Sequence, residues 1–584
     1  MPLLRDIRAQ LGSAYLLDHV DNPVAWRSWG DDALEEARVS DRPIFLSVGY
    51  AACHWCHVMA HESFEDDAIA ERLNDHFIPV KVDREERPDV DALYMAATQL
   101  ASGHGGWPMS VFLLPNGRPF FAGTYYPPVD RGGQVGFSRL LDALSDAWEH
   151  QRELIERQAG DLHNALIREV RFVDHLEPLH ESIDLAAVRQ RLDESLVAQV
   201  DDDGGFGGAP KFPRPSFVAA LLEFDDPASR DAIGRTMDAM SRRGLYDHFG
   251  GGFARYSVDG EWHVPHFEKM LSDQALLARC YFDAARVLHR PHWRDVALDT
   301  LRFVERSLRV KGGYAASLDA DAGGVEGSHI TWTRAEVEAV LSEAGLGELL
   351  GDVLSRWRIE EYGEFEGRSI PRLADEAPFA TPERLSGAYD ALRRARAKRV
   401  QPGRDEKVIL EWNAMLASAF LHSDDAHFES LGEELLDSIL LHHFAGDTWW
   451  RTTHHQAHAT AADLAWLINA LLDAFEQSGD DRWLESARDV AAYLLAHHWD
   501  GPLASAATPH AGRGVFTQSD LVTDLATRPK DIFDGATPSA HATCTRALAR
   551  LALCAGDVDL LAVAQRLVEL AGSLIVSHPG AVVD

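Results

Sequence analysis

Residues 43–57 read PIFLSVGYAACHWCH, an apolar run of strand length that leads into two cysteines separated by two residues. The residues that follow, Val58 to Phe77, have the composition of a helix. A thiol at the N-terminus of a helix lies at the positive end of the helix dipole, which lowers its pKa and favours the reactive thiolate. The spacing therefore predicts a redox-capable pair, with Cys53 as the attacking thiol and Cys56 as the resolving thiol.

Two histidines leave a second interpretation open. His57 and His61 lie four residues apart on the same predicted helix. A compact zinc site could then be formed by Cys53, Cys56, His57 and His61. An inert structural pair is the third interpretation. Redox chemistry is the preferred one, and no resident cofactor is predicted. We expect His54, between the cysteines, to stabilise the thiolate and to make the pair more oxidising.

Length and composition exclude several classes of protein. A chain of 584 residues is too long for one ordinary core, and 46% hydrophobic residues with 25% charged residues are typical of globular domains. The 56 basic and 92 acidic residues give a net charge of −36, so neither nucleic acid nor an anionic membrane is expected as a partner. The first residues lack an apolar signal segment, no stretch approaches a membrane span, and five cysteines make no disulfide framework. We therefore expect a cytoplasmic protein.

The segments around the cysteine pair predict an α/β domain over residues 1–165. Helices are expected at 31–39, 58–77 and 89–101, and strands at 43–49, 77–82 and 109–114. This order is that of a thioredoxin-like layer, in which a cis-proline precedes the third central strand and packs against the disulfide. Pro108 directly precedes the strand at 109–114, so we predict that its peptide bond is cis. The charged run Asp83–Arg87 follows a central strand and either acts on the sulfurs or is solvated.

Residues 185–584 repeat one plan, a helix followed by a short loop and a second helix. Five pairs are predicted, at 217–224 with 230–243, 272–288 with 293–308, 413–421 with 428–441, 463–475 with 483–497, and 539–554 with 560–575. In 463–475 one apolar stripe is formed by Leu464, Leu467, Ile468, Leu471, Leu472 and Phe475. Such pairs cannot bury their apolar faces alone and must stack on their neighbours. With room for a sixth pair, the repeats predict an all-α (α/α)6 toroid, and an open solenoid is the alternative.

Long inserts between the pairs hold the candidate binding residues. They are rich in glycine, aromatic and acidic residues, and in a toroid they share one rim. Aromatic rings among carboxylates suit carbohydrate. Glycoside hydrolysis needs two carboxyl groups, whereas epimerisation next to a carbonyl needs one or two bases. The candidate catalytic residues are Cys53, Cys56, Pro108, Asp247, Glu268 and Asp273. The candidate ligand-binding residues are Tyr246, Arg255, Tyr256, His266, Trp412, Asp463 and Asp534.

Several stretches in both halves resemble the spermatogenesis-associated protein 20 family. They are residues 53–59, 62–64, 81–89, 105–108, 123–127, 210–213, 244–257, 262–270, 405–407, 412–413, 534–536 and 538–539. The resemblance implies a thioredoxin-like domain joined to a six-hairpin-glycosidase-like toroid over nearly the whole chain. We expect a redox-capable CxxC joined to a toroid that binds or processes a sugar-like ligand, with a protein thiol as a further candidate partner. The candidate reactions are thiol–disulfide exchange and glycosidase- or epimerase-like chemistry, and a non-catalytic scaffold is the alternative.

Overall fold

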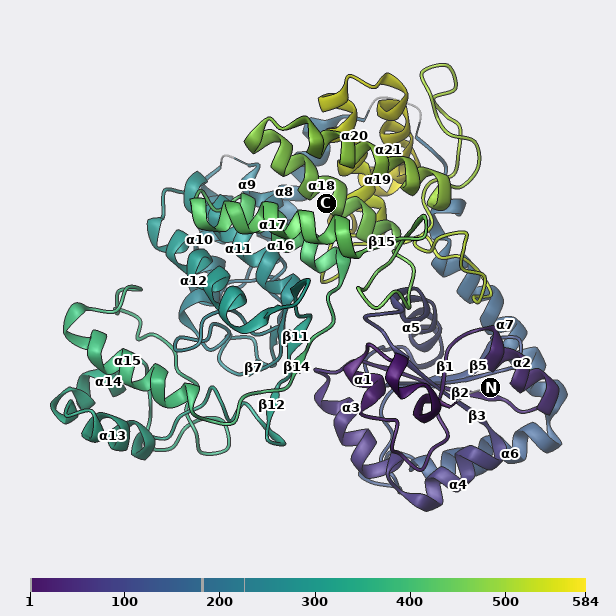
Figure 1. Cartoon of the computed structure of the whole chain (residues 1–584), viewed down its shortest axis with the longest axis horizontal. Helices are drawn as coiled ribbons and strands as arrows, with labels where there is room; N and C mark the ends of the chain where they lie inside the picture. Colours follow the sequence, from purple (N-terminus) through teal and green to yellow (C-terminus); the bar gives the residue numbers. More distant parts are fainter. Residues whose placement is uncertain (1–2, 180–182, 225, 584) are drawn as a thin grey trace.

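The computed structural model describes residues 3–179, 183–224 and 226–583. Figure 1 shows an N-terminal α/β domain and a larger helical domain packed against it, as the sequence predicts. The chain passes from one to the other between α7 (Arg152–Val170) and α8 (Leu185–Val197). The predicted outer limits, residues 1 and 584, lie outside the described residues.

The N-terminal domain is built on a five-stranded sheet with thioredoxin topology. Its strand order is β1 (Arg27–Ser28), β3 (Ile78–Asp83), β2 (Ile44–Gly49), β4 (Met109–Leu113) and β5 (Pro119–Gly123). Strands β1, β3 and β2 are parallel, and β4 and β5 are antiparallel to their neighbours. Successive side chains of a strand point to opposite faces. Ile44 and Leu46 therefore join one core and Phe45 the other, which places β2 in the middle of the domain.

Helices cover both faces of this sheet. One face packs against α3 (His54–Met59), α4 (Asp67–His76) and α6 (Phe137–His150), and the other against α2 (Asp31–Ser40), α5 (Pro88–Ser102) and α7. The prediction of a single helix over 58–77 is wrong. Helix α3 continues into a π-helical turn at Ala60–Phe64, and the helix then ends before α4 begins. Asp66 starts α4 by accepting the backbone N–H of Ile69, the ordinary role of aspartate at a helix N-cap.

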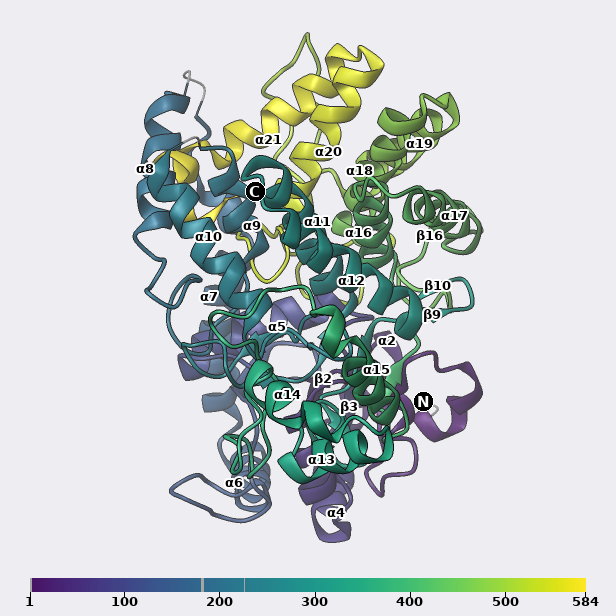
Figure 2. The same cartoon turned by 90° about the vertical axis from the view of Figure 1, so that its left-hand side faces the viewer.

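The five predicted helix pairs are all present in the helical domain. They are α9 (Pro215–Leu222) with α10 (Pro227–Arg242), α11 (Leu271–Val287) with α12 (Pro291–Leu308), α16 (Leu410–Leu421) with α17 (Ala426–His442), α18 (Ala461–Ser478) with α19 (Asp481–His498), and α20 (Ala540–Ala555) with α21 (Val558–Ser577). The first helices of the pairs pack side by side, and Figure 2 shows the second helices outside them. Every residue of α16 is buried, as an inner helix requires.

The place predicted for a sixth pair is taken by α8. This helix packs on α9 and α10 and against the short turn Pro579–Ala581 that follows α21. The backbone N–H of Leu179 also donates to the carbonyl of Glu569 in α21. Contacts between the beginning and the end of the helical domain thus close the ring, which confirms the toroid and not the open solenoid.

Two features of the helical domain depart from the sequence analysis. The insert between α12 and α16 carries α13 (Arg334–Glu343), α14 (Leu350–Arg356) and α15 (Glu383–Ala397), which share a separate core (Figure 1). Among the described residues, α21 has the length and apolar composition of a membrane-crossing helix. Half of that stretch is buried in the fold, as in the core helix of a globular domain.

Two inserts, the one before α11 and the one between α12 and α16, meet in a small antiparallel sheet on the rim. It consists of β8 (Lys269–Met270), β11 (Ser317–Leu318) and β14 (Arg404–Asp405), with β11 in the middle. These inserts precede the N-termini of inner helices, and their polar side chains reach the thioredoxin-like domain. Glu268 contacts Tyr50, and Lys407 contacts Asp83. The inserts therefore form the surface on which the first domain rests.

Candidate functional site

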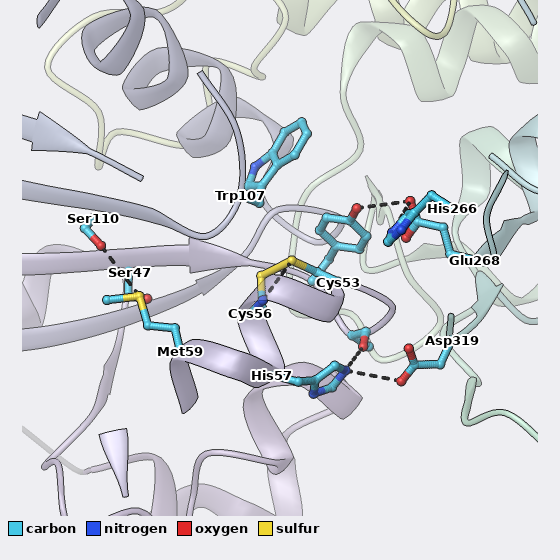
Figure 3. Close-up of a disulfide and its surroundings, with 12 residues drawn as sticks. Ser47, Cys53, Cys56, His57, Met59, Trp107, Ser110, His266, Glu268 and Asp319 are labelled. Atoms are coloured by element: carbon cyan, nitrogen blue, oxygen red, sulfur yellow. Dashed lines mark hydrogen bonds and ion pairs between the residues drawn. A yellow bond between two sulfur atoms is a disulfide. The ribbon is translucent and has the colours of Figure 1, made fainter. Parts of the chain in front are cut away.

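Cys53 and Cys56 are joined in a disulfide at the start of α3. Cys53 is the N-cap of the helix, and its Sγ accepts the backbone N–H of Cys56 at 3.2 Å. The Trp107–Pro108 peptide bond is cis, as predicted, and Figure 3 shows Trp107 beside the disulfide. Cys53 is only 4% exposed and Cys56 only 2%. Cys53, the predicted attacking thiol, is therefore largely enclosed in the oxidised protein, and the rim residues Glu268 and His266 lie on its side of the pair.

Glu268 on the rim is the centre of the polar contacts that face the disulfide. Its Oε1 accepts the hydroxyl of Tyr50 at 3.2 Å and lies 3.5 Å from Nε of Arg255 and 3.7 Å from Nε2 of His266. Figure 3 shows Glu268 and His266 on the side of Cys53. Glu268 is fully buried, and its Oε2 has no hydrogen-bond partner among the described residues. We term the disulfide with Tyr50, Arg255, His266 and Glu268 the redox–rim site.

Two further predicted residues border this site. Asp273, in the first turn of α11, has a carboxyl whose pKa burial raises to about 6 against the opposing charge of Arg255. Tyr256 stacks on His266 with 5.0 Å between the ring centroids. Burial alone would lower the pKa of His266, but hydrogen bonding to Glu326 and the charge of Glu268 raise it. The rim thus presents a carboxyl that takes up its proton at a higher pH than an ordinary aspartate, and an imidazole whose pKa is raised.

The histidines of the CxxC segment pair with acidic residues of the rim. Nδ1 of His54 lies 3.2 Å from Asp321, whose hydrogen bond raises the pKa of the imidazole. Nε2 of His57 lies 2.8 Å from the carbonyl of Ala51 and 3.2 Å from Asp319. Because Asp321 neutralises a protonated His54, the expected stabilisation of a Cys53 thiolate is offset.

The four residues of the alternative zinc site are not gathered around one point. The cysteines bond each other, His57 faces Asp319, and His61 pairs with Glu65 at 2.9 Å. Within the described chain, the one group of metal-ligating side chains close enough to share an ion is Asp83, Glu85 and Asp405. The ammonium of Lys407 already lies against all three carboxylates, 2.9 Å from both Glu85 and Asp405. The ammonium of Lys407 therefore occupies the position that a metal ion would take.

This buried cluster excludes one of the two interpretations of the run Asp83–Arg87, and an action on the sulfurs stays a prediction. Asp83, Glu85 and Glu86 are buried between the domains, so the solvated-run interpretation is wrong. Burial, opposed by Lys407, raises the pKa of Glu85 to about 7. Burial and the charge of Asp83 raise the pKa of Glu86 to about 8. The last residue of the run, Arg87, pairs with Asp89 and with Asp524 of the helical domain.

Glu86→Gln is expected to stabilise the fold at alkaline pH. The ordinary pKa of a glutamate is 4.5, whereas that of folded Glu86 is about 8, so the folded state binds more protons between these values. The wild type therefore loses stability as the pH rises through this window, and the glutamine variant does not. We expect its advantage in urea unfolding to grow by on the order of 2 kcal/mol between about pH 5 and about pH 8.5. Exposed Glu338→Gln is the control, and an equal advantage at both pH values would contradict the prediction.

A glycine beneath the disulfide leaves room for the sulfur. A Cβ on Gly49 would lie 2.7 Å from Sγ of Cys56 and 2.3 Å from the hydroxyl of buried Tyr15. Gly49→Ala is therefore expected to destabilise the oxidised protein by about 1–3 kcal/mol and to speed reduction by dithiothreitol. Gly160→Ala, in open space on α7, is the matched control and should be neutral or stabilising. Unchanged unfolding and reduction of Gly49→Ala would show that the sulfur is not packed against this position.

The remaining candidate residues have other partners. Asp247 binds Lys269 at 2.8 Å and Arg396 at 2.5 Å, and these cations outweigh burial and hold the pKa of the carboxyl far below its usual range. The hydroxyl of Tyr246 donates to Asp299. Asp247 and Tyr246 therefore stabilise the insert between α10 and α11.

Three other candidate residues lie at or near the starts of inner helices. Asp463 closes the capping box of α18 and binds Arg451 at 2.7 Å, Asp534 accepts the N–H of Ser539, and Trp412 packs in the core. Arg451 in turn donates to the carbonyl of Glu85, so Asp463 supports the domain interface.

Sequence reasoning did not single out several residues that complete the site. Tyr50, Asp319, Asp321 and Arg451 are all buried or partly buried at the interface. Tyr50 directly precedes the cysteine segment, and the two aspartates lie in an acidic, glycine-rich insert. Their closeness in sequence to these motifs could have indicated all three residues. Lys407 lies in one of the family-like stretches, but its partners are distant in sequence.

Comparison with known proteins identifies relatives of the whole chain. A family model named thioredoxin-like DsbH, described as a protein of unknown function (DUF255), matches residues 7–167. Spermatogenesis-associated protein 20 of Rattus norvegicus is 34% identical over 610 residues, covering 94% of this chain and 75% of the relative.

Two solved structures are similar to parts of the chain. A sugar epimerase from a ruminal bacterium is 12% identical, with a TM-score of 0.43, covering 67% of this chain and 87% of its own. A DsbH oxidoreductase is 19% identical, with a TM-score of 0.17, covering 22% of this chain and 85% of its own. The identity to the rat protein extends over both domains, and the chain belongs to the spermatogenesis-associated protein 20 family.

Proposed function

We propose that this chain is a thiol–disulfide oxidoreductase whose Cys53–Cys56 pair reacts with a thiol admitted between its two domains. The observation that carries the proposal is a disulfide at a strand-to-helix junction that faces the polar rim of a second domain. The hydrogen bond from Tyr50 to Glu268 fastens the rim insert to the residues that precede the pair. An acidic, globular chain with few cysteines suits the cytoplasm, where we propose that it acts.

The chemistry is a two-electron exchange. A substrate thiolate attacks Sγ of Cys53, the Cys53–Cys56 bond breaks, and Cys56 leaves as a thiolate that takes up a proton. A second substrate thiolate then attacks the substrate sulfur of the mixed disulfide and releases Cys53 as a thiolate, which takes up the second proton. Two substrate thiols become one disulfide, and the protein gains two electrons and two protons. The backbone N–H of Cys56, which already donates to Sγ of Cys53, stabilises the thiolate that is released.

The low exposure of the cysteine pair limits the size of the substrate that can reach it. With both cysteines less than 5% exposed, a folded protein cannot bring a disulfide to Sγ of Cys53 while the domains are closed. We therefore propose a small thiol as the substrate. Glutathione should oxidise and reduce the pair, and a folded protein disulfide of the same potential should react more slowly.

The decisive experiment is the reduction potential of the pair in glutathione buffers, with metal content determined on the same sample. We expect a reversible two-electron couple between roughly −270 and −120 mV, the range of known redox proteins, and no bound zinc. Stoichiometric zinc, or cysteines that never form a disulfide in solution, would overturn the proposal.

A second candidate function is the binding of a sugar-like ligand at the rim. The hydrogen-bond capacity left on Oε2 of Glu268 and Oδ2 of Asp273, beside the stacked rings of Tyr256 and His266, favours a hydroxyl-rich ligand. Calorimetric titration with D-mannose and cellobiose tests it, and Glu268→Gln should weaken the binding. If neither sugar binds the wild type, this second candidate is wrong.

A further inference from the structure

A cavity that shares no residue with the redox–rim site lies at the seam between the domains. Its volume is about 310 Å³. The thioredoxin-like domain contributes Trp29, Asp31, Arg87 and Asp89, and the helical domain contributes residues 456–460, 518–519 and 521–524. This volume is at the lower end of the range for small-molecule sites.

Three side chains that line the cavity each carry a buried polar atom without a hydrogen-bond partner among the described residues. They are Oε1 of Gln518, Nε1 of Trp29 and Nδ1 of His458. Gln518 is only 3% exposed, and its amide is oriented by a contact of 3.5 Å from Nε2 to Asp524. A buried polar group that is left unpaired costs about 1–3 kcal/mol, and folded proteins rarely tolerate several together. Three such side chains at one cavity are an arrangement that a polar ligand would complete once their polar groups turn toward it.

The chemistry of these atoms restricts the ligand. An indole N–H only donates and an amide oxygen only accepts, so the ligand must present both an acceptor and a donor. A hydroxyl group does both. The ring of Trp29 adds an apolar wall against which the carbon skeleton of a sugar can pack.

The charges around the cavity disfavour an anion. Arg87 is held by two pairs of hydrogen bonds, one pair to Asp89 and one to Asp524, so its charge is already matched. Asp31 adds a third carboxylate to the lining. Burial and the charge of Arg87 lower the pKa of His458, so that this imidazole is neutral at pH 7. The cavity lining therefore carries three carboxylates and one arginine, and that arginine is already paired with two of the carboxylates.

We propose that this cavity binds a polyhydroxylated molecule of monosaccharide size that is neutral or carries an ammonium group. Because its walls come from both domains, the bound molecule holds them together. The site goes beyond the proposed redox function and shares no residue with the redox–rim site.

Isothermal titration calorimetry with D-glucose, D-glucosamine and D-glucuronate tests the proposal on the full chain. We expect D-glucose or D-glucosamine to bind and to raise the unfolding temperature, and D-glucuronate not to bind. Gln518→Met and Trp29→Phe each remove one of the unpaired atoms and keep the approximate shape of the side chain. Each should weaken binding about tenfold, the equivalent of 1.4 kcal/mol. Because the two variants lie in different domains, one still tests the site if the other fails to fold.

Glu268→Gln separates this site from the rim. It should leave binding in the seam cavity unchanged. The proposal is overturned if neither sugar binds, or if both variants bind as tightly as the wild type. It is also overturned if Glu268→Gln alone abolishes binding, a result that would instead support the sugar-binding role of the rim. The reduction potential of the cysteine pair should be the same in Gln518→Met as in the wild type, so failure of the cavity proposal leaves the redox proposal intact.

Discussion

Lys407→Met is expected to destabilise the folded protein severely. The ammonium of Lys407 is fully buried against Asp83, Glu85 and Asp405, and methionine keeps the approximate length of the side chain but not the charge. Breaking a buried ion pair from one side typically costs about 3–5 kcal/mol, because the partner charge stays buried without compensation. Chemical denaturation at pH 8 measures the loss, and exposed Lys311→Met is the matched control.

The pH dependence of this variant identifies the cause of the loss. The carboxyl groups around Lys407 already have raised pKa values, to about 7 for Glu85 and about 8 for Glu86. Without the lysine their pKa values should rise further, so acidification protonates them and restores part of the lost stability. The deficit should therefore shrink between about pH 8 and about pH 5. A deficit independent of pH would assign the lysine a packing role only.

The two cysteine variants are expected to separate the roles of the thiols. With Cys56→Ser, the Cys53 thiolate should attack glutathione disulfide and release one glutathione thiolate, and the mixed disulfide should accumulate because no second protein thiol resolves it. With Cys53→Ser, Cys56 should react little, since it is 2% exposed and lies one turn into the helix. Turnover with glutathione should fall at least about 100-fold in both, because neither variant can form the Cys53–Cys56 disulfide that accepts the two electrons. Mass spectrometry of the intact protein detects the adduct.

The control for this pair is Cys554→Ser, which changes a distant, partly buried thiol. Its turnover should equal that of the wild type. If Cys56→Ser forms no adduct while Cys53→Ser does, the assignment of the attacking and resolving thiols is reversed.

The sequence predicted the parts of the fold that short-range patterns control. The apolar run before Cys53, the stripe of 463–475 and the proline before 109–114 each reflect local geometry, and the structure confirms the strand, the helix and the cis bond. The break within 58–77 was missed because the apolar pattern continues through it, although Asp66 is a normal N-cap.

The candidate site was harder to predict, because long-range packing assembles it. Nothing local indicates that Lys407 meets Asp83, 324 residues earlier, or that Arg451 reaches the carbonyl of Glu85. The glycine-rich insert near residue 268 was identified as a binding region, but its position against the cysteines depends on how two inserts join in one sheet. Asp247 was predicted to be catalytic because it lies in a segment rich in glycine and aromatic residues. In the structure its carboxylate is paired with Lys269 and Arg396.

The rim residues beside the cysteine pair are synthesised later than the pair itself. The residues that contact the first domain from the rim are translated 218 to 366 residues after their partners. At about 5 to 20 residues per second, this delay lasts roughly ten seconds to a minute. During that interval the nascent thiols have no toroid beside them. The pair is therefore open to large redox partners only before the helical domain is complete, and later exchange takes place with the rim in position.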